Sequence, residues 1–250
     1  MTRGAAALAL LLAAAAPARA ACPDVPTVAR FALALLERGV PTAFAVTSPA
    51  EAYCAQHRLV ALLAQPWGDV QGPALAAETL PPPRGSLFFA SLRATSGATI
   101  EAGYAARPAI APGIILRIGE DGRAVAASPY LALLDLAAMP DGMGELARIA
   151  GNLGLRLGVV GPEAPLPPAT PDALLQANGS TVAALAHLGL AASPEDLLAS
   201  LARDLAAEGT PLRPGSRVAL LAAPASMAPR PGETWRLSIA GLGAVVVNFR

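Results

Sequence analysis

Apolar residues recur at helical spacing in three segments of the chain, which run from 24 to about 38, from 48 to 65 and from 193 to 209. Each segment begins at a residue that suits a helix N-cap, namely Asp24, Ser48 or Ser193. After Ser48, proline stands at the first helical position and Glu51 at the third, which is the order of a capping box. The pattern predicts three amphipathic helices.

From Gly85 onward the apolar residues fall in short runs that are typical of strands. These runs are 86–93, 98–104, 113–118, 130–136, 153–161, 173–177, 180–188, 217–224, 233–241 and 244–250. Asn178-Gly179 predicts a hairpin turn. Segment 66–84, with three consecutive prolines, is expected to be a loop, and 140–153 a short helix with loops. Helices followed by many strands indicate the α+β class.

The first twenty residues have the three-part order of a secretory signal peptide: Arg3, an apolar run from Ala5 to Ala16, and a small-x-small site at 18–20. The run is too short to cross a bilayer of about 30 Å. An Ala-rich buried helix and a lipoprotein signal before Cys22 are weaker alternatives. We expect a periplasmic protein without stable membrane insertion after cleavage. Residues 21–250 would form a single domain, with a helical part at 24–66 and a β-rich part at 85–250.

Composition and cysteine usage exclude several classes of function. The formal net charge is zero, so a nucleic-acid partner is not expected. The sequence has no C-x-x-C pair and only two histidines, so a structural zinc site is not expected. Cys22 and Cys54 are a disulfide candidate in an oxidising compartment, and two unpaired buried thiols are the alternative. No nucleophile elbow or dinucleotide fingerprint occurs, and His57 and His187 are most simply ordinary structural residues.

The C-terminal third carries a recognisable order of turns. A helix ends at Gly209, and the chain continues through 211–216, 231–233 and 241–243, which read PLRPGS, PGE and GLG. The second predicted helix contributes Ala52-Tyr53 and Gln56, and GSLF follows at 85–88. This chain resembles the 2-keto-4-pentenoate hydratase family of the fumarylacetoacetate hydrolase superfamily. The resemblance covers most of residues 25–250 and is most specific at the C-terminus.

The resemblance implies a mixed β-roll or sandwich with peripheral helices, of the fumarylacetoacetate hydrolase C-terminal-domain type, in a homo-oligomer. It also implies chemistry that depends on Mg²⁺ or Mn²⁺, held by an E-x-E pair on a strand and a third glutamate. Alternation along a strand places both residues of E-x-E on one face. The metal polarises a 2-keto acid and stabilises enolate charge, and a lysine assists.

The residues matched to these positions carry no such chemistry. Ala111 and Gly113 fall at the two glutamates, Leu134 at the third and Ala74 at the lysine, and the sequence contains no lysine. The family's late Thr-Gly becomes Leu221-Ala222, and its Asp-Asn becomes Gly151-Asn152. We therefore assign no catalytic residue, and we expect neither a metal ion nor another cofactor.

Other side chains are candidates for a remaining pocket or a rebuilt metal site. Asp135, Asn152, Tyr53 and Gln56 are the candidates for a residual pocket. The acids available for a rebuilt site are Glu101, Glu120, Asp121, Asp135, Asp141 and Glu145. Asp135 is a poor substitute for Leu134, because a shift of one residue along a strand reverses the face.

The leading hypothesis is an exported, hydratase-like protein that is non-catalytic and binds a small carboxylate in the inherited pocket. The alternative is a divalent-metal-dependent hydratase (a lyase), decarboxylase or hydrolase that acts on a 2-keto acid. A purely structural secreted domain is the third interpretation.

Overall fold

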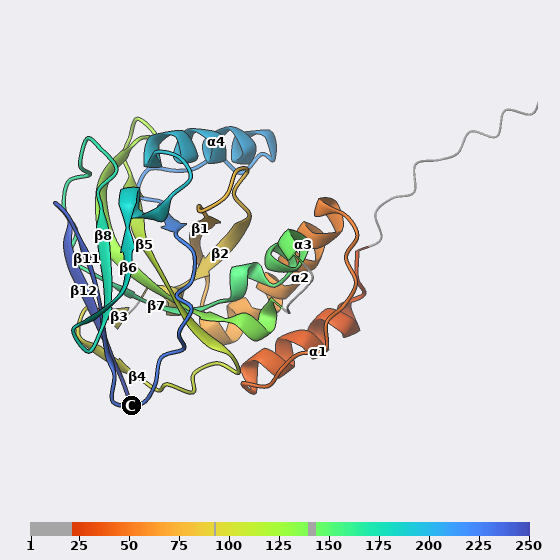
Figure 1. Cartoon of the computed structure of the whole chain (residues 1–250). Helices are drawn as coiled ribbons and strands as arrows, with labels where there is room; N and C mark the ends of the chain where they lie inside the picture. Colours follow the sequence, from red (N-terminus) through yellow and green to blue (C-terminus); the bar gives the residue numbers. More distant parts are fainter. Residues whose placement is uncertain (1–21, 93, 140–143) are drawn as a thin grey trace, which may run out of the picture.

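The computed structural model describes residues 22–92, 94–139 and 144–250 (Figure 1). The helices are α1 Val25–Leu36, α2 Pro49–Trp67, α3 Gly144–Ala150 and α4 Pro194–Ala207. The strands are β1 Val70–Ala76, β2 Arg84–Phe88, β3 Ala94–Thr95, β4 Ala98–Ile100, β5 Pro108–Ile118, β6 Ala124–Asp135, β7 Leu155–Val160, β8 Ala173–Ala177, β9 Ser180–Leu185, β10 Arg217–Leu221, β11 Thr234–Ile239 and β12 Gly243–Phe249. The predicted signal peptide lies outside the described residues. No helix in the described ranges is long and apolar enough to cross a membrane.

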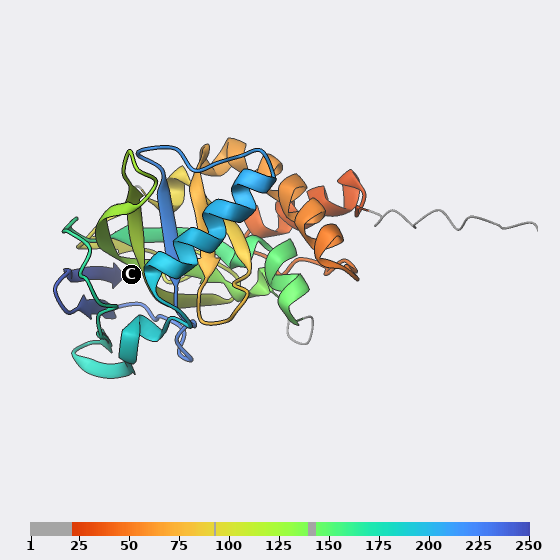
Figure 2. The ribbon, with the colours of Figure 1, turned by 90° about the horizontal axis from the view of Figure 1, so that it is seen from above.

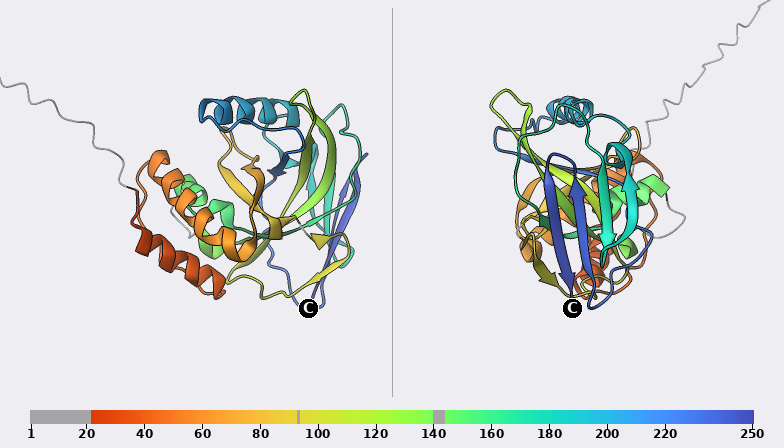
Figure 3. Two further views of the ribbon diagram at one scale, coloured as in Figure 1. Left: turned by 180° about the vertical axis from the view of Figure 1, so that it is seen from behind. Right: turned by 60° about the vertical axis from the view of Figure 1, so that its left-hand side comes forward.

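Two sheets form the centre of the fold. A seven-stranded sheet has the order β2-β1-β10-β5-β6-β7-β3, and a five-stranded sheet has the order β4-β12-β11-β8-β9. The large core lies between them: Ile114 and Leu131 of the first sheet share a cluster with Trp235 and Val247 of the second. Helix α4 lies across one end of this core, and the other helices gather on the far side of the large sheet (Figures 1, 2 and 3). This confirms the predicted α+β class and sandwich-like architecture.

Strand β5 is apolar because both of its faces are covered. Ile110, Ile114 and Leu116 point into the core between the sheets. Ala111 and Ile115 alternate with them and point to the opposite face, where they join a second apolar cluster. A strand buried on both faces reads as a continuous apolar run rather than an alternating one.

The predicted N-caps are confirmed for α1, α2 and α4. Ser48 Oγ accepts from the Glu51 amide at 3.3 Å, and Ser193 Oγ accepts from the Asp196 amide at 3.1 Å. The return bond of the capping box is displaced by one residue, because Glu51 Oε2 accepts from the Thr47 amide at 2.7 Å. Asn178 and Gly179 both have positive φ, 48° and 80°, as a type I′ hairpin turn requires.

The prediction that 66–84 is a loop was wrong for part of this segment. Helix α2 continues through Pro66 to Trp67, and β1 occupies 70–76. Gly72 and Pro73 disfavour a strand locally, but pairing with β2 and β10 supplies the hydrogen bonds that the sequence pattern does not reveal. An added Cβ at Gly72 would lie 1.9 Å from the Arg217 carbonyl oxygen, so the glycine permits the close approach of β10.

Several other predicted strands are shorter than expected. The run at 86–93 leaves the sheet after Phe88 and turns into a short 3-10 helix, Phe89–Ser91. The run at 98–104 ends at Ile100, and that at 180–188 ends at Leu185, before His187 and Leu188 adopt positive φ. Strand ends depend on where a partner strand stops, and the chain's own pattern does not contain that information.

A disulfide joins Cys22 to Cys54 on α2, with a sequence separation of 32 residues. It ties the N-terminal end of the described chain to the helical layer. This is the pairing that the sequence favoured over two free thiols.

Replacing both cysteines with serine is expected to lower the free energy of unfolding by roughly 2–4 kcal/mol, because a closed loop of this length restricts the unfolded chain. Urea unfolding of the oxidised protein and the double variant measures the difference. The double variant should be insensitive to reductant, whereas the parent should lose the same stability when it is reduced. Equal midpoints for the oxidised parent and the variant would contradict the prediction.

Candidate functional site

The outer face of the large sheet, which points away from the five-stranded sheet, brings the four family-matched positions together. Ala74 lies on β1, Ala111 and Gly113 on β5, and Leu134 on β6. With β10 these strands are consecutive in the sheet, in the order β1-β10-β5-β6. Strand alternation places Gly113 on the same face as Ala111. Ala74, Ala111 and Leu134 belong to one buried apolar cluster. Segments that are far apart in the sequence therefore converge where the resemblance expects a site.

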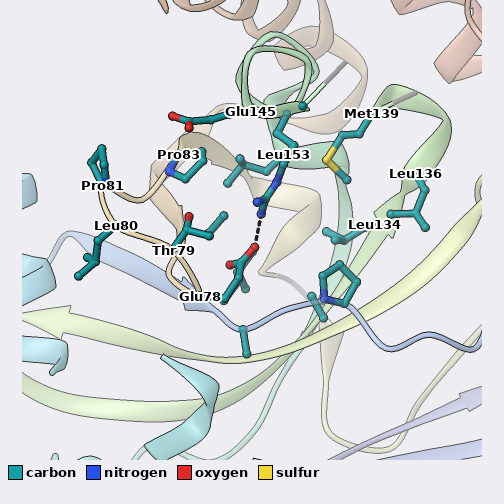
Figure 4. A pocket seen from close by; sticks show the side chains of 17 residues that line it. Glu78, Thr79, Leu80, Pro81, Pro83, Leu134, Leu136, Met139, Glu145 and Leu153 are labelled. Carbon is teal, nitrogen blue, oxygen red and sulfur yellow. Dashed lines mark hydrogen bonds and ion pairs between the residues drawn. The ribbon is translucent and has the colours of Figure 1, made fainter. Parts of the chain in front are cut away.

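A cleft of 490 Å³ opens over this face (Figure 4). Its floor and walls are mostly apolar. The lining residues are Ala76, Glu78, Thr79, Leu80, Pro81, Pro83, Ala111, Leu134, Leu136, Met139, Gly144, Glu145, Arg148, Leu153, Leu221, Ala222 and Pro224. The volume is within the range of about 300–1,000 Å³ that small-molecule sites occupy.

Two of the four matched positions do not reach this cleft. Ala74 is fully buried, and its neighbour on the same face, Ala76, lines the cleft instead. Gly113 is closed off by the backbone of β10, since an added Cβ would lie 2.3 Å from the Leu220 carbonyl oxygen. No side chain fits at Gly113 without moving one of two central strands.

Three charged residues of the described chain line the cleft. Glu78 lies in the loop after β1, while Glu145 and Arg148 stand on α3. Arg148 Nη2 donates to Glu78 Oε1 in an ion pair, drawn as the dashed line in Figure 4. The Glu78 side chain is 17% exposed and that of Arg148 is 28% exposed, so the pair is largely shielded from water. Glu145 is exposed.

The sequence interpretation did not identify Glu78 and Arg148, which are 70 residues apart. The sequence did contain one indication that Glu78 has a partner. Glu78 follows the strand that carries Ala74, at the end of a buried apolar run, where an acid is unusual unless it is paired.

Asp135 does not line the cleft. It is 2% exposed and points away from the face that carries Leu134. Its carboxylate accepts from the amides of Ala106, Arg107 and Ala137 at 3.1, 3.0 and 3.0 Å. Burial, and then the Asp135 charge, raise the pKa of the Tyr104 phenol well above its usual value. Asp135 therefore fixes the end of β6 against the segment before β5.

The other three residual-pocket candidates also lie outside the cleft wall. Gln56 Nε2 donates to the carbonyls of Arg84 and Ile149, both at 2.7 Å. Asn152 accepts from the Ser86 amide at 2.6 Å and donates to the Ser86 carbonyl at 3.0 Å. Tyr53 packs under the Arg84 guanidinium, whose carbon lies 5.2 Å from the ring centroid, and burial raises the pKa of the Tyr53 phenol. These side chains join the helical layer to β2.

The acids considered for a rebuilt metal site do not converge. Glu101 pairs with Arg38 at 2.7 Å on the surface, and Glu120 and Asp121 lie in an exposed turn. Of these acids only Glu145 lines the cleft, and Asp141 is outside the described residues. The described part of the chain contains no group of three or more His, Cys, Asp or Glu side chains placed to hold a metal ion.

The two histidines are separate from the cleft. His57 lines an exposed groove on the other side of β2 together with Gln56 and Thr210. His187 has a left-handed backbone with φ 49°, and its amide donates to Asp172 Oδ1 at 2.8 Å. Neither residue faces a nucleophile or a second ligand in the described structure.

No family model and no curated protein matches this chain. Solved structures do. A 4-oxalocrotonate decarboxylase from Pseudomonas putida G7, complexed with magnesium and adipate, has a TM-score of 0.70 and 17% identity, over 82% of this chain and 87% of that chain. A fumarylpyruvate hydrolase from Pseudomonas aeruginosa, in complex with Mn²⁺ and pyruvate, has a TM-score of 0.55 and 19% identity, over 71% and 87% of the two chains.

A 2-hydroxyhepta-2,4-diene-1,7-dioate isomerase from Mycobacterium marinum is also similar, with a TM-score of 0.55 and 12% identity, over 72% of this chain and 75% of that chain. At these identities the likeness establishes the fold. The chain has the fold of the fumarylacetoacetate hydrolase superfamily, of the C-terminal-domain type that the sequence resemblance implied.

The metal that this fold family implies does not fit the residues present. Mg²⁺ and Mn²⁺ require several oxygen ligands in near-octahedral geometry. Ala111 and Leu134 offer the cleft only carbon atoms, and Gly113 has no room for a side chain. Glu78, a largely shielded acid in the cleft wall, is already bound to Arg148.

Proposed function

We propose that this protein is an exported, non-catalytic relative of the 2-keto-4-pentenoate hydratases that binds a small carboxylate in the cleft over the large sheet. The observation that carries the proposal is the apolar floor at Ala111 and Leu134, beside a glycine that no side chain can replace. The pocket persists while the residues that would hold the family's metal are absent from its wall.

The carboxylate assignment rests on Arg148, the one cationic side chain among the described lining residues. A guanidinium carries five N–H donors, and the contact with Glu78 uses the Nη2 end. The remaining donors suit a carboxylate, for which arginine geometry is well matched. The similar structures named above support this choice, because two of them were solved with adipate or pyruvate.

The non-catalytic assignment follows from the chemistry of 2-keto acids. Turnover requires a positive group at the developing enolate oxygen, usually a metal ion in this fold, and a base. The floor of this cleft is apolar, and the Arg148 guanidinium and the Glu78 carboxylate in its wall are bound to each other. A metal-dependent hydratase, decarboxylase or hydrolase remains the second candidate. The only observation in its favour is that two of the similar solved structures contain a divalent metal ion.

Titration of Mn²⁺ into the chelator-stripped mature protein by calorimetry is expected to give no saturable binding. Pyruvate and adipate, titrated without metal, should bind and raise the melting temperature.

Arg148→Met should weaken carboxylate binding by about tenfold or more, since a charge-assisted hydrogen bond is lost. Arg123→Met, at an exposed turn, is the matched control.

Saturable one-site Mn²⁺ binding at micromolar strength, with turnover of a 2-hydroxydienoate that stops on adding chelator, would establish the enzyme instead. If neither metal nor carboxylate binds, the structural-domain interpretation is favoured.

Export is tested separately, by fusing residues 1–24 to a reporter that is active only outside the cytoplasm. Size-exclusion chromatography with light scattering tests the expected homo-oligomer.

A further inference from the structure

The charges around the cleft do not match a simple anion. Among the described lining residues there are two carboxylates, Glu78 and Glu145, and one guanidinium, Arg148. The described part of the wall therefore carries one more carboxylate than guanidinium groups. A ligand that carries only a carboxylate would add to this excess. A ligand that also carries a cationic group would neutralise it.

Glu78 is only half satisfied. Its Oε1 binds Arg148, whereas its Oε2 is buried and has no hydrogen-bond partner. Leaving a buried charged acceptor unpaired is costly, and such groups in native proteins usually indicate an absent partner. Glu78 lines the cleft, and the terminal torsion of a glutamate is broad, so a small rotation can turn Oε2 toward the cleft while Oε1 stays beside Arg148. A hydrogen-bond donor from a ligand would then complete the site.

Apolar side chains occupy the wall beyond the charged pair. Leu134, Leu136, Met139 and Leu153 line it together, and Figure 4 shows them on the side of the cleft next to the ion pair. This surface suits an aliphatic or aromatic body, whose burial is favourable at about 25 cal/mol per Å². The polar and apolar parts of the cleft are therefore adjacent and distinct.

We propose that the cleft selects a small apolar molecule that bears both a carboxylate and an ammonium group, as an α-amino acid does. This rests on the proposed carboxylate-binding function and narrows its ligand class. The carboxylate binds the free donors of Arg148, the ammonium donates to Glu78 Oε2, and the apolar body covers Leu134 and Met139. A 2-keto acid of the same skeleton brings no donor and leaves Glu78 unpaired.

Calorimetry with isosteric ligand sets tests the selection. The sets are leucine, 2-hydroxy-4-methylpentanoate and 4-methyl-2-oxopentanoate, with the corresponding valine and phenylalanine skeletons, titrated into the intact mature protein. We expect the amino acid of at least one skeleton to bind about tenfold or more tightly than its keto acid, with the hydroxy acid between them. In Glu78→Gln this preference should fall to about threefold or less. Glu120→Gln, which alters an exposed carboxylate in a turn that does not line the cleft, should keep it.

Keto acids that bind as tightly as the amino acids, or more tightly, would overturn the selection while leaving the carboxylate-binding function intact. If no member of any set binds the parent protein, the proposed function itself fails. An amino-acid preference that survives in Glu78→Gln would remove Glu78 from the explanation. Thermal unfolding of each variant shows whether the cleft is intact, and the comparison within the parent protein does not depend on any variant.

Discussion

Replacing Asp135 with alanine is expected to lower the free energy of unfolding by roughly 3–5 kcal/mol, because three backbone amides, one buried and two partly buried, would lose their acceptor together. The carboxylate is 2% exposed, so water cannot replace it without opening the end of β6. Each unpaired buried donor costs about 1–3 kcal/mol. Urea unfolding followed by circular dichroism, with an unchanged m-value, measures the loss.

Asp135→Asn is the graded control. Its remaining oxygen can still accept from Arg107 and Ala137, while its amide faces the Ala106 N–H without an acceptor, so the loss should be about half as large. Under conditions where the variants are folded, carboxylate binding in the cleft should be unchanged. A variant that keeps its stability and loses binding would show that Asp135 serves the pocket instead.

The parts of the fold that local chemistry controls could be predicted from the sequence. Helix caps at Asp24, Ser48 and Ser193 depend on a side chain reaching an amide three residues away, so the pattern contains the whole interaction. The Asn178-Gly179 turn is similar, because its φ values restrict the residue types. The turn order of the C-terminal third was enough to identify the fold.

The parts that depend on distant partners could not be predicted. Strand β1 contains glycine and proline, and it becomes a strand only because β2 and β10 flank it. The pair Glu78–Arg148 joins a loop to α3, and neither residue is distinctive in its own segment. Whether Asp135 could take the place of Leu134 in the cleft depended on a shift of one residue. Leu134 and Asp135 are adjacent in the sequence and face opposite sides of the sheet.

The small and apolar residues on the outer face are related to one another in the structure. Ala74 and Ala219 are paired on β1 and β10, and β5 lies on the other side of β10. Small side chains here let the sheet face pack closely while Ala111 and Leu221 remain at the cleft floor. Glutamates at the family-matched positions would thus be opposed by the packing of this face.

Gly113→Ala is therefore expected to destabilise the protein by roughly 3–5 kcal/mol, although it adds only one methyl group. The new Cβ would lie 2.3 Å from the Leu220 carbonyl oxygen, and β5 and β10 are both interior strands of the large sheet. Backbone overlap cannot be relieved by a change of rotamer, so the strands must separate and lose hydrogen bonds. Urea unfolding, with the variant purified from the soluble fraction, measures the cost.

Ala111→Ser is the matched control on the same strand and face, and it should stay within about 1 kcal/mol of the parent because Ala111 borders the cleft. The triple variant Ala111→Glu, Gly113→Glu, Leu134→Glu should not yield a folded protein that binds Mn²⁺. Position 113 has no space for the added glutamate side chain. A stable Gly113→Ala variant would mean that β10 yields at this point. The metal site would then be only three substitutions away, and its loss would be a matter of side-chain identity rather than of the backbone.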